Sequence, residues 1–198
     1  MIDVTLAVLA GGRGVRMGAP KSGLVIEGRP IFEYLLDRFK WDGPTMLVTG
    51  VGNQRPVGWE RFDLEVTDAV ADQGPLRGVL TALEHARTEL VALVTVDMPG
   101  VTGEQIDWLV DTLLAQSNLL AVMCARTIDG ISRIEPFPSV LRASAKELIA
   151  RRLTARCSSV HSLGEEQGVM VIAAPTVWPA RTWTNLKRPE DVQAYRHE

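Results

Sequence analysis

Short, wholly apolar runs alternate along this chain with stretches whose apolar residues recur every three or four positions. Continuous apolar runs are typical of strands buried on both faces of a parallel sheet. Such runs cover residues 5–10, 45–49, 90–96 and 119–125. Residues 62–67 alternate instead, and residues 134–138 and 169–174 have an extended pattern. The pattern predicts a sheet made mostly of parallel strands.

The spacing of apolar residues predicts helices in the segments between these strands. Ile31, Leu35 and Phe39 recur at intervals of four after Pro30, and apolar residues at positions 76, 79, 80 and 83 follow Pro75. Thr102 and Gln105 have the spacing of a capping box at the start of a third helix. We also expect helices over residues 140–153 and 189–195.

The alternation of strands and helices predicts the fold class. A single three-layer α/β/α domain of Rossmann-like type, spanning residues 1–198 with a mostly parallel sheet, fits the order best. Ligands of such folds bind beyond the carboxyl ends of the strands. We therefore expect the functional residues in segments 11–21, 50–53, 68–78 and 97–99.

Composition narrows the function classes. The 198 residues include 21 Lys plus Arg and 24 Asp plus Glu, for a net charge of −3, whereas a general nucleic-acid binder has a basic excess. The longest apolar run, residues 119–125, is far shorter than the ~20 residues that span a bilayer. The start lacks a basic leader segment, and the two cysteines form no close motif. We expect a cytoplasmic protein that binds neither nucleic acid nor membrane.

Residues 9–24, LAGGRGVRMGAPKSGL, carry the clearest chemical signal. Glycines directly after a buried strand let backbone N–H groups approach an anion, and Arg16 and Lys21 add charged donors. The dinucleotide fingerprint fails because its third glycine falls on Met17. The Walker A pattern fails as well, because Pro20 precedes Lys21. The segment therefore predicts a phosphate loop of another kind.

The pattern L-x-G-G-x-G-x-R-M-G-x-P-K resembles the signature of the MobA-like molybdenum cofactor guanylyltransferases. Three later segments resemble the same family in the same order along the chain. They are Gly74-Pro75-Leu76-Arg77-Gly78, Asp97-Met98-Pro99, and Asn185 followed by Pro189-Glu190-Asp191. The resemblance covers nearly the whole chain and implies a fold of the nucleotide-diphospho-sugar transferase type.

The resemblance also implies an activity and its residues. The family transfers GMP from GTP to the terminal phosphate of molybdopterin and releases pyrophosphate, with Mg²⁺ as cofactor. Carried over by position, the residues that bind the nucleotide are Leu9, Ala10, Gly11 and Gly12 by their backbone, Lys21 at the phosphates and Asp68 at the nucleoside. Asp97 is the implied Mg²⁺ ligand, and Lys21, Arg16 and Asp97 are the implied catalytic residues. GTP and molybdopterin are the implied small-molecule partners, with transient contacts to other cofactor-biosynthesis proteins or molybdoenzyme chaperones.

Elementary chemistry supports these roles. Nucleotidyl transfer concentrates negative charge on the α-phosphate and the leaving pyrophosphate, so fixed cations suffice and no protein nucleophile is required. Mg²⁺ is usually held by one or two carboxylates together with phosphate oxygens and water. Each acid also has a purely structural interpretation: Asp97 could cap the turn before Pro99, and Asp68 could be an ordinary loop residue.

Four departures from the family pattern leave two alternatives open. Pro20 replaces an acidic residue, Thr49-Gly50 stands where Asn is common, Lys187 replaces a second Asn, and Arg133-Ile134-Glu135-Pro136 lacks a His-Pro pair. The first alternative is a related transferase that uses CTP or another acceptor, such as a sugar phosphate. The second is a nucleotide-binding module without transfer activity, although such a module needs neither Lys21 nor Asp97.

Overall fold

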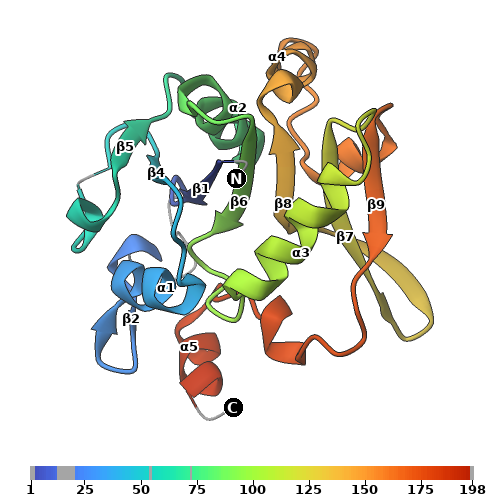
Figure 1. The fold of residues 1–198 in the computed structure, drawn as a ribbon. Coiled ribbons are helices and arrows are strands. Elements are labelled where there is room, and N and C mark those ends of the chain that lie inside the picture. Colours follow the sequence, from blue (N-terminus) through green and yellow to red (C-terminus); the bar gives the residue numbers. More distant parts are fainter. Residues whose placement is uncertain (1–2, 13–20, 54, 72, 197–198) are drawn as a thin grey trace.

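The described residues, 3–12, 21–53, 55–71 and 73–196 of a computed structural model, form one seven-stranded sheet and a two-stranded hairpin (Figure 1). The strand order in the sheet is β5-β4-β1-β6-β8-β7-β9. The strands are β1 (Val4–Leu9), β4 (Thr45–Thr49), β5 (Leu64–Thr67), β6 (Leu90–Thr95), β7 (Ala121–Ile128), β8 (Ile131–Arg142) and β9 (Val169–Ala173). Only β8 among them runs antiparallel to its neighbours.

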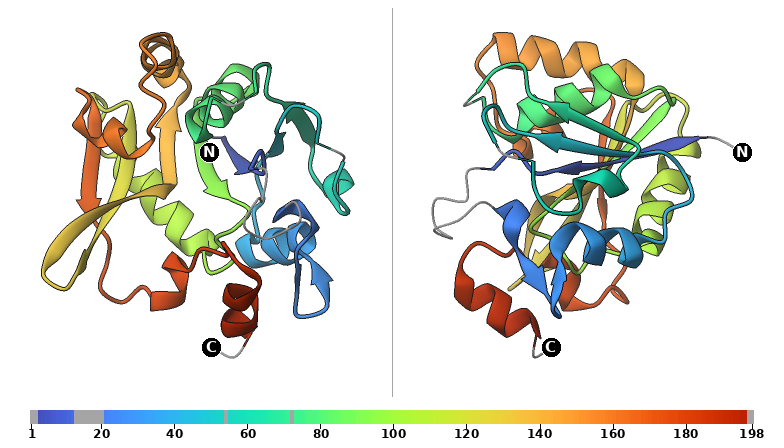
Figure 2. Two further views of the ribbon diagram at one scale, coloured as in Figure 1. Left: turned by 180° about the vertical axis from the view of Figure 1, so that it is seen from behind. Right: turned by 90° about the vertical axis from the view of Figure 1, so that its left-hand side faces the viewer.

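Helices cover both faces of this sheet. The helices are α1 (Ile31–Phe39), α2 (Pro75–His85), α3 (Gly103–Leu114), α4 (Lys146–Thr154) and α5 (Pro189–Arg196). Figure 2 shows α2 and α4 on one side of the strands and α1 and α3 on the other. The predicted three-layer α/β/α architecture with a mostly parallel sheet is therefore confirmed.

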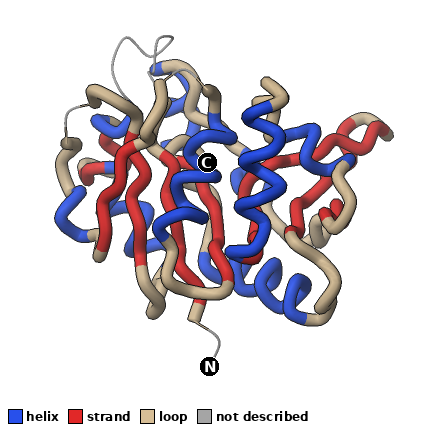
Figure 3. The backbone as a smooth tube through the Cα atoms, turned by 90° about the horizontal axis from the view of Figure 1, so that it is seen from above, coloured by secondary structure: helices blue, strands red, loops and turns tan. Residues whose placement is uncertain are grey.

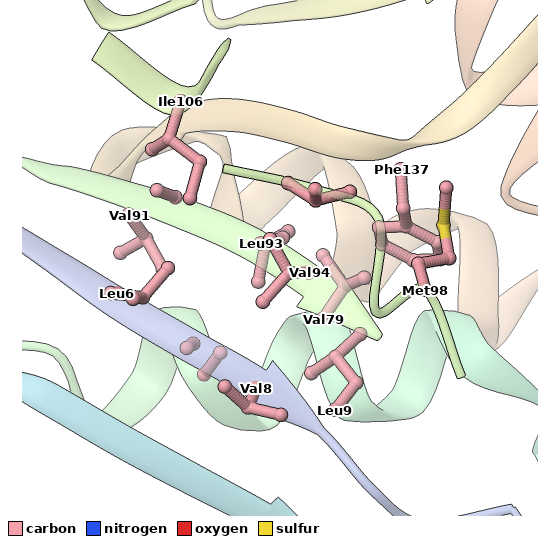
Figure 4. Close-up of a cluster of buried hydrophobic side chains, with 14 of the residues drawn as sticks. Leu6, Val8, Leu9, Val79, Val91, Leu93, Val94, Met98, Ile106 and Phe137 are labelled. Carbon is pink, nitrogen blue, oxygen red and sulfur yellow. The ribbon is translucent and has the colours of Figure 1, made fainter. Parts of the chain in front are cut away.

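The core lies between β1 and β6 and the helices above and below them. Leu6 and Val8 of β1 and Leu93 of β6 are almost completely buried. Ile106 of α3 and Val79 of α2 pack against these two strands from opposite faces (Figure 4). Burying aliphatic side chains of this size stabilises a fold by about 1.5–3 kcal/mol each, so these two strands are a rigid base for whatever follows them.

Most of the predicted elements match the structure to within two residues, and the predicted capping box is present. The backbone N–H of Thr102 donates to Oε1 of Gln105 at 3.0 Å, at the first turn of α3. The short hairpin of β2 (Val25–Ile26) and β3 (Arg29–Pro30) was not predicted. Its turn at Glu27 and Gly28 has positive φ angles of 51° and 75°, which a period-based pattern does not reveal.

The predicted helix over residues 140–153 is wrong at its start. Val140 and Leu141 continue β8 and pair with β6 on one side and β7 on the other. A 3₁₀ turn, Ala143–Ala145, separates the strand from α4. The apolar pair Val140-Leu141 suits a buried strand and a buried helix equally, and the free partner positions between β6 and β7 decide the outcome.

The carboxyl ends of β1, β4, β5 and β6 lie at one edge of the sheet. On the same edge the β7–β8 hairpin projects beyond the strands (Figures 1 and 3). Across the part of the chain that the structure describes, every helix is too short or too polar to cross a membrane.

Candidate functional site

Four strand ends enclose a cavity of about 360 Å³ at the carboxyl edge of the sheet. Its walls come from the loops after β1, β4, β5 and β6 and from the first turn of α2. Leu9, Gly11, Gly12, Asp68 and Asp97, which are distant in the sequence, all line it. The position agrees with the general rule that α/β sheets bind ligands outside the carboxyl ends of their strands.

The floor of the cavity is bare backbone. A Cβ atom on Gly50 would lie 2.7 Å from the carbonyl oxygen of Gly11, and a Cβ on Gly11 would lie 3.3 Å from Oδ2 of Asp68. The chain after β1 and the chain after β4 therefore touch without side chains between them. Glycine is needed at Gly50 because of this close approach, and the resulting surface leaves peptide groups accessible to a ligand.

Ala10 is a predicted nucleotide-binding residue that does not line the cavity. It is buried, and its N–H donates to the carbonyl oxygen of Val48 at 2.8 Å. Leu9 does line the cavity, and its carbonyl oxygen accepts a hydrogen bond from the N–H of Val96 at 3.1 Å. Both bonds extend the sheet by one residue and fix where Gly11 begins to turn.

Asp68 is half-buried at the end of β5. Its N–H donates to the carbonyl oxygen of Thr49 at 2.9 Å, and its Oδ1 accepts a hydrogen bond from Oγ1 of Thr81 at 2.7 Å. Burial raises the pKa of the Asp68 carboxyl, while the Thr81 hydrogen bond and the charge of Arg77 act in the opposite direction. A carboxylate that folding partly desolvates is ready to accept hydrogen bonds from a ligand.

Helix α2 points its N-terminus at the same cavity. Gly74 precedes the helix with φ of 69°, and Pro75 occupies the first turn, where its missing N–H costs no hydrogen bond. Gly74, Pro75, Arg77 and Gly78 all line the cavity. The exposed N–H groups and dipole of a helix start favour an anion there.

Asp97 follows β6 and is 8% exposed. Its carbonyl oxygen accepts a hydrogen bond from the N–H of Leu186 at 2.8 Å. The hydroxyl of Tyr195, on α5, donates to the carbonyl oxygen of Pro99 at 2.9 Å. The C-terminal segment thus supports the loop that carries Asp97.

The support is close-packed. A Cβ on Gly100 would lie 1.9 Å from the carbonyl oxygen of Arg181, so the two backbones touch at that point. Nε2 of Gln105 donates to Oγ1 of Thr182 at 2.8 Å, and both residues are buried. The segment around Asn185 therefore positions the Asp97 loop from behind.

The positions of the side chains of Arg16 and Lys21, the two predicted cations, are not described. Arg16 lies outside the described residues. The backbone of Lys21 begins a 3₁₀ turn, Lys21–Gly23, at the point where the described chain resumes. Their roles at the phosphates remain those implied by the family resemblance.

The structure adds residues that the sequence reasoning did not single out. Asn53, Gln73 and Arg77 line the cavity, and Thr81 holds Asp68. The sequence predicts that segments 50–53 and 68–78 matter as strand-end loops. Of their members it singles out Asp68, and Arg77 only as part of the 74–78 motif. A buried threonine on the apolar face of a helix belongs to no sequence motif. The one signal for Thr81 is its spacing of four residues after Arg77.

Asp191 of the C-terminal motif stabilises the start of α5. Oδ2 of Asp191 accepts hydrogen bonds from the N–H groups of Lys187 and Arg188 at 2.7 and 2.8 Å, at the start of α5.

Trp183 is 9% exposed and packs against Trp178, with ring centroids 5.7 Å apart, and against the guanidinium of Arg126. These contacts give Trp183 a packing role.

Comparisons with known proteins agree with the fold and the motifs. The profile of the family described as MobA-like NTP transferase domain matches residues 6–190. A molybdenum cofactor guanylyltransferase of Albidiferax ferrireducens is 34% identical over 156 residues, which cover 75% of this chain and 74% of that protein. A second, from Serratia proteamaculans, is 35% identical over 155 residues, or 75% of each chain.

Solved structures show the same architecture. Molybdopterin-guanine dinucleotide biosynthesis protein A of Archaeoglobus fulgidus superposes with a TM-score of 0.78 at 20% identity, over 98% of this chain and 97% of that one. A 4-diphosphocytidyl-2C-methyl-D-erythritol synthase of Anaerococcus prevotii reaches 0.70 at 16% identity, over 99% and 95%. These likenesses show the fold. Together with the profile over residues 6–190 and the relatives in the first comparison, they lead to one conclusion: this chain belongs to the MobA-like NTP transferase family.

Proposed function

We propose that this chain transfers the GMP unit of GTP to the terminal phosphate of molybdopterin and releases pyrophosphate. The relatives that match 75% of the chain are named molybdenum cofactor guanylyltransferases, which supports this choice of substrates. The observation that carries the proposal is the cavity that brings Asp68 and Asp97 together around the bare backbone of Gly11 and Gly50.

The reaction asks for charge stabilisation and orientation. An oxygen of the acceptor phosphate attacks the α-phosphorus of GTP, a new P–O bond forms, and the bond from the α-phosphorus to the bridging oxygen of the β-phosphate breaks. Pyrophosphate leaves with the electron pair. No protein atom forms a bond in this step, so the chain contributes by binding the nucleotide and by placing positive charge around the phosphates.

Each part of the cavity has a role in this scheme. Oδ2 of Asp68 accepts hydrogen bonds from donors on the nucleoside. The peptide groups around Gly11 and Gly12 and the N-terminus of α2 face the rest of the nucleotide. Lys21 and Arg16 stabilise the charge on the phosphates, as the family resemblance implies.

The donor set around Asp97 suits Mg²⁺ chemically. No cluster of three or more His, Cys, Asp or Glu side chains is present within the described ranges, so a closed protein cage for a metal is not what these residues provide. Mg²⁺ is instead held by one or two carboxylates together with substrate phosphates and water. Asp97 would be the protein ligand, and bound Mg²⁺ would neutralise charge on the phosphates.

An assay of pyrophosphate release tests the proposal. Purified protein with Mg²⁺, molybdopterin and GTP should release pyrophosphate and form the guanine dinucleotide, while CTP and ATP should give little of either. Asp97→Ala should lose the activity, and Asp111→Asn, an exposed acid on α3, should retain it. Turnover with CTP in place of GTP would reject guanine as the base, and no turnover with any nucleotide would favour a binding module.

A further inference from the structure

Thr81 lies behind the cavity, on the buried face of α2. It is 1% exposed, and none of the sequence motifs includes it. Its Oγ1 lies 2.7 Å from Oδ1 of Asp68, 3.3 Å from Nε of Arg77 and 3.1 Å from the carbonyl oxygen of Arg77. A hydroxyl in a helix commonly bonds only to the carbonyl four residues before it, so the contact with Asp68 calls for its own explanation.

The single hydroxyl hydrogen can serve one acceptor at a time. The Asp68 carboxylate offers the shorter contact and, when ionised, the stronger acceptor, so the hydrogen points to Oδ1. The Thr81 oxygen is then available to accept the N–H of Arg77. Thr81 in this way connects a cationic donor to an anionic acceptor.

Arg77 is itself held in place. Its Nη2 lies 2.6 Å from Oε2 of Glu84, about two turns further along α2. The positions 77, 81 and 84 share one face of the helix. A continuous chain of hydrogen bonds therefore runs from Glu84 at the surface through Arg77 and Thr81 to Asp68 at the cavity.

The consequence for Asp68 is a fixed orientation. Oδ1 is occupied by Thr81, and Oδ2 is the oxygen next to Gly11, 3.3 Å from where a Cβ on that glycine would be. Rotation of the carboxyl group would break the bond with Thr81. Oδ2 is then the oxygen presented to a ligand lying on the glycine backbone.

We propose that Thr81 is a positioning residue for nucleotide binding: its hydroxyl holds the Asp68 carboxylate so that Oδ2 accepts hydrogen bonds from the nucleoside. The inference rests on the proposed function, because it takes Asp68 as the nucleoside-binding residue. Thr81 itself does not touch the nucleotide in this scheme. Its effect is on affinity, and the chemical step is left nearly unchanged.

The electrostatics of the pocket agree with this role. Burial raises the pKa of Asp68, and the hydrogen bond from Thr81 is the largest influence in the opposite direction, followed by the charge of Arg77. The charged residues that line the cavity with Asp68 in the described chain are Arg77 from α2 and Asp97 from the loop after β6, while the loops after β1 and β4 present the glycines Gly11 and Gly50. Without the hydroxyl, Asp68 should take up a proton at a higher pH.

The test compares three variants by isothermal titration with GTP and, separately, with CTP, in the presence of Mg²⁺ between pH 5 and 8. Thr81→Val keeps the shape of the side chain and removes the hydroxyl, whereas Thr81→Ser keeps the hydroxyl. Thr112→Val is the matched control, since the hydroxyl of Thr112 on α3 donates to the carbonyl oxygen of Trp108, four residues before it on its own helix. If Thr81→Val unfolds, Thr81→Ala serves as the hydroxyl-free variant.

We expect Thr81→Val to bind GTP about tenfold more weakly than the wild type, because the charge-assisted hydrogen bond that holds the Asp68 carboxylate is lost. Its affinity should fall at a higher pH than that of the wild type as the solution is acidified. Thr81→Ser and Thr112→Val should behave like the wild type, and kcat at saturating GTP should change less than KM.

Equal affinities and equal pH profiles for Thr81→Val and the wild type would overturn the inference and leave the proposed function intact. Weak binding by Thr81→Ser as well would also overturn it, because the methyl group and not the hydroxyl would then matter. The same pattern seen with CTP and not with GTP would support the role of Thr81 and reject the proposed base. Failure of the wild type to bind either nucleotide would reject both.

Discussion

Two aspartates flank the same strand and have opposite environments. Asp63 precedes β5 at the amino edge of the sheet, where its Oδ2 accepts hydrogen bonds from the N–H and the hydroxyl of Thr45, each at 2.8 Å. These donors hold the pKa of Asp63 below its usual value. Asp68 follows β5 at the carboxyl edge, where burial raises its pKa.

The comparison distinguishes an aspartate that stabilises the fold, Asp63, from one that is available to a ligand, Asp68. The ionised carboxylate of Asp63 is hydrogen-bonded by the N–H and hydroxyl of Thr45, so its charge stabilises the junction of β4 and β5. Asp68 has a half-buried carboxylate, one oxygen of which accepts a hydrogen bond from Thr81, and burial makes folding less favourable with its charge than without it. Residues that remain incompletely satisfied in a native structure cluster at functional sites, and here the two edges of one sheet divide accordingly.

The strongest way to break this comparison is Asp97→Ala, at the carboxyl edge. Removing a fixed charge-binding group from a preorganised site costs on the order of 10²–10³ in rate. We expect transfer activity to fall by at least that much while the protein stays folded, because the backbone contacts of Asp97 remain. Pyrophosphate release and thermal unfolding measured side by side check both parts. Activity within a few fold of the wild type would remove Asp97 from the site.

Gly50→Ala tests the close approach at the cavity floor. The added methyl group would lie 2.7 Å from the carbonyl oxygen of Gly11, and overpacking of this kind typically costs about 1–3 kcal/mol. We expect that loss in the free energy of unfolding, measured with urea. Gly23→Ala is the control, because a Cβ there meets no atom within 4 Å. Equal stability of the two variants would show that the floor relaxes freely.

Asp63→Ala tests the amino edge. The variant loses two hydrogen bonds to a carboxylate near the surface, and we expect it to be about 1 kcal/mol less stable at pH 7. The pKa of Asp63 is lowered in the folded state, so its contribution is present above the unfolded value of 3.8 and is lost as the pH falls through the folded pKa. Urea unfolding at pH 7 and pH 3 measures this. A difference that stays constant across that range would contradict the electrostatic account.

Asp68→Asn should give the smallest change, with the opposite sign. Because the folded pKa is raised, the carboxyl favours folding below its unfolded value of 3.8 and loses that advantage as the pH rises through the folded pKa. An amide removes the cost of the buried charge and can still accept from Thr81. We expect a slightly higher melting temperature than the wild type at pH 7 and no gain at pH 3. A lower melting temperature at pH 7 would contradict the assignment of Asp68 as an incompletely satisfied acid.

The sequence predicted the fold well where local pattern and tertiary position agree. The buried strands at residues 45–49 and 90–96 and the capping box of α3 are examples, because a continuous apolar run or a reciprocal hydrogen bond needs little outside information. The pattern predicts a helix at Val140 and Leu141, since their apolar character does not distinguish a buried helix from a buried strand. The partners in β6 and β7, which lie far away in the sequence, decide the matter.

The site shows the same division. The family resemblance implies roles for Asp68 and Asp97, which also follow predicted strands, and the structure brings both to one cavity. Thr81 was missed because its importance comes from a contact with Asp68 across thirteen positions of sequence, and a threonine within an apolar helix face is usually a packing residue. Contacts between elements, unlike periods within them, require the fold itself.

The most direct test of the account is the affinity of three proteins for GTP with Mg²⁺, measured by isothermal titration: the wild type, Asp68→Asn and Asp63→Ala. We predict that the wild type and Asp63→Ala bind GTP equally well, since Asp63 lies at the opposite edge of the sheet from the cavity. Asp68→Asn should bind at least about tenfold more weakly, because a charged acceptor contributes about 1.5–3 kcal/mol to such a contact. Equal affinity of Asp68→Asn and the wild type, or a loss confined to Asp63→Ala, would contradict the assignment of the carboxyl edge as the nucleotide site.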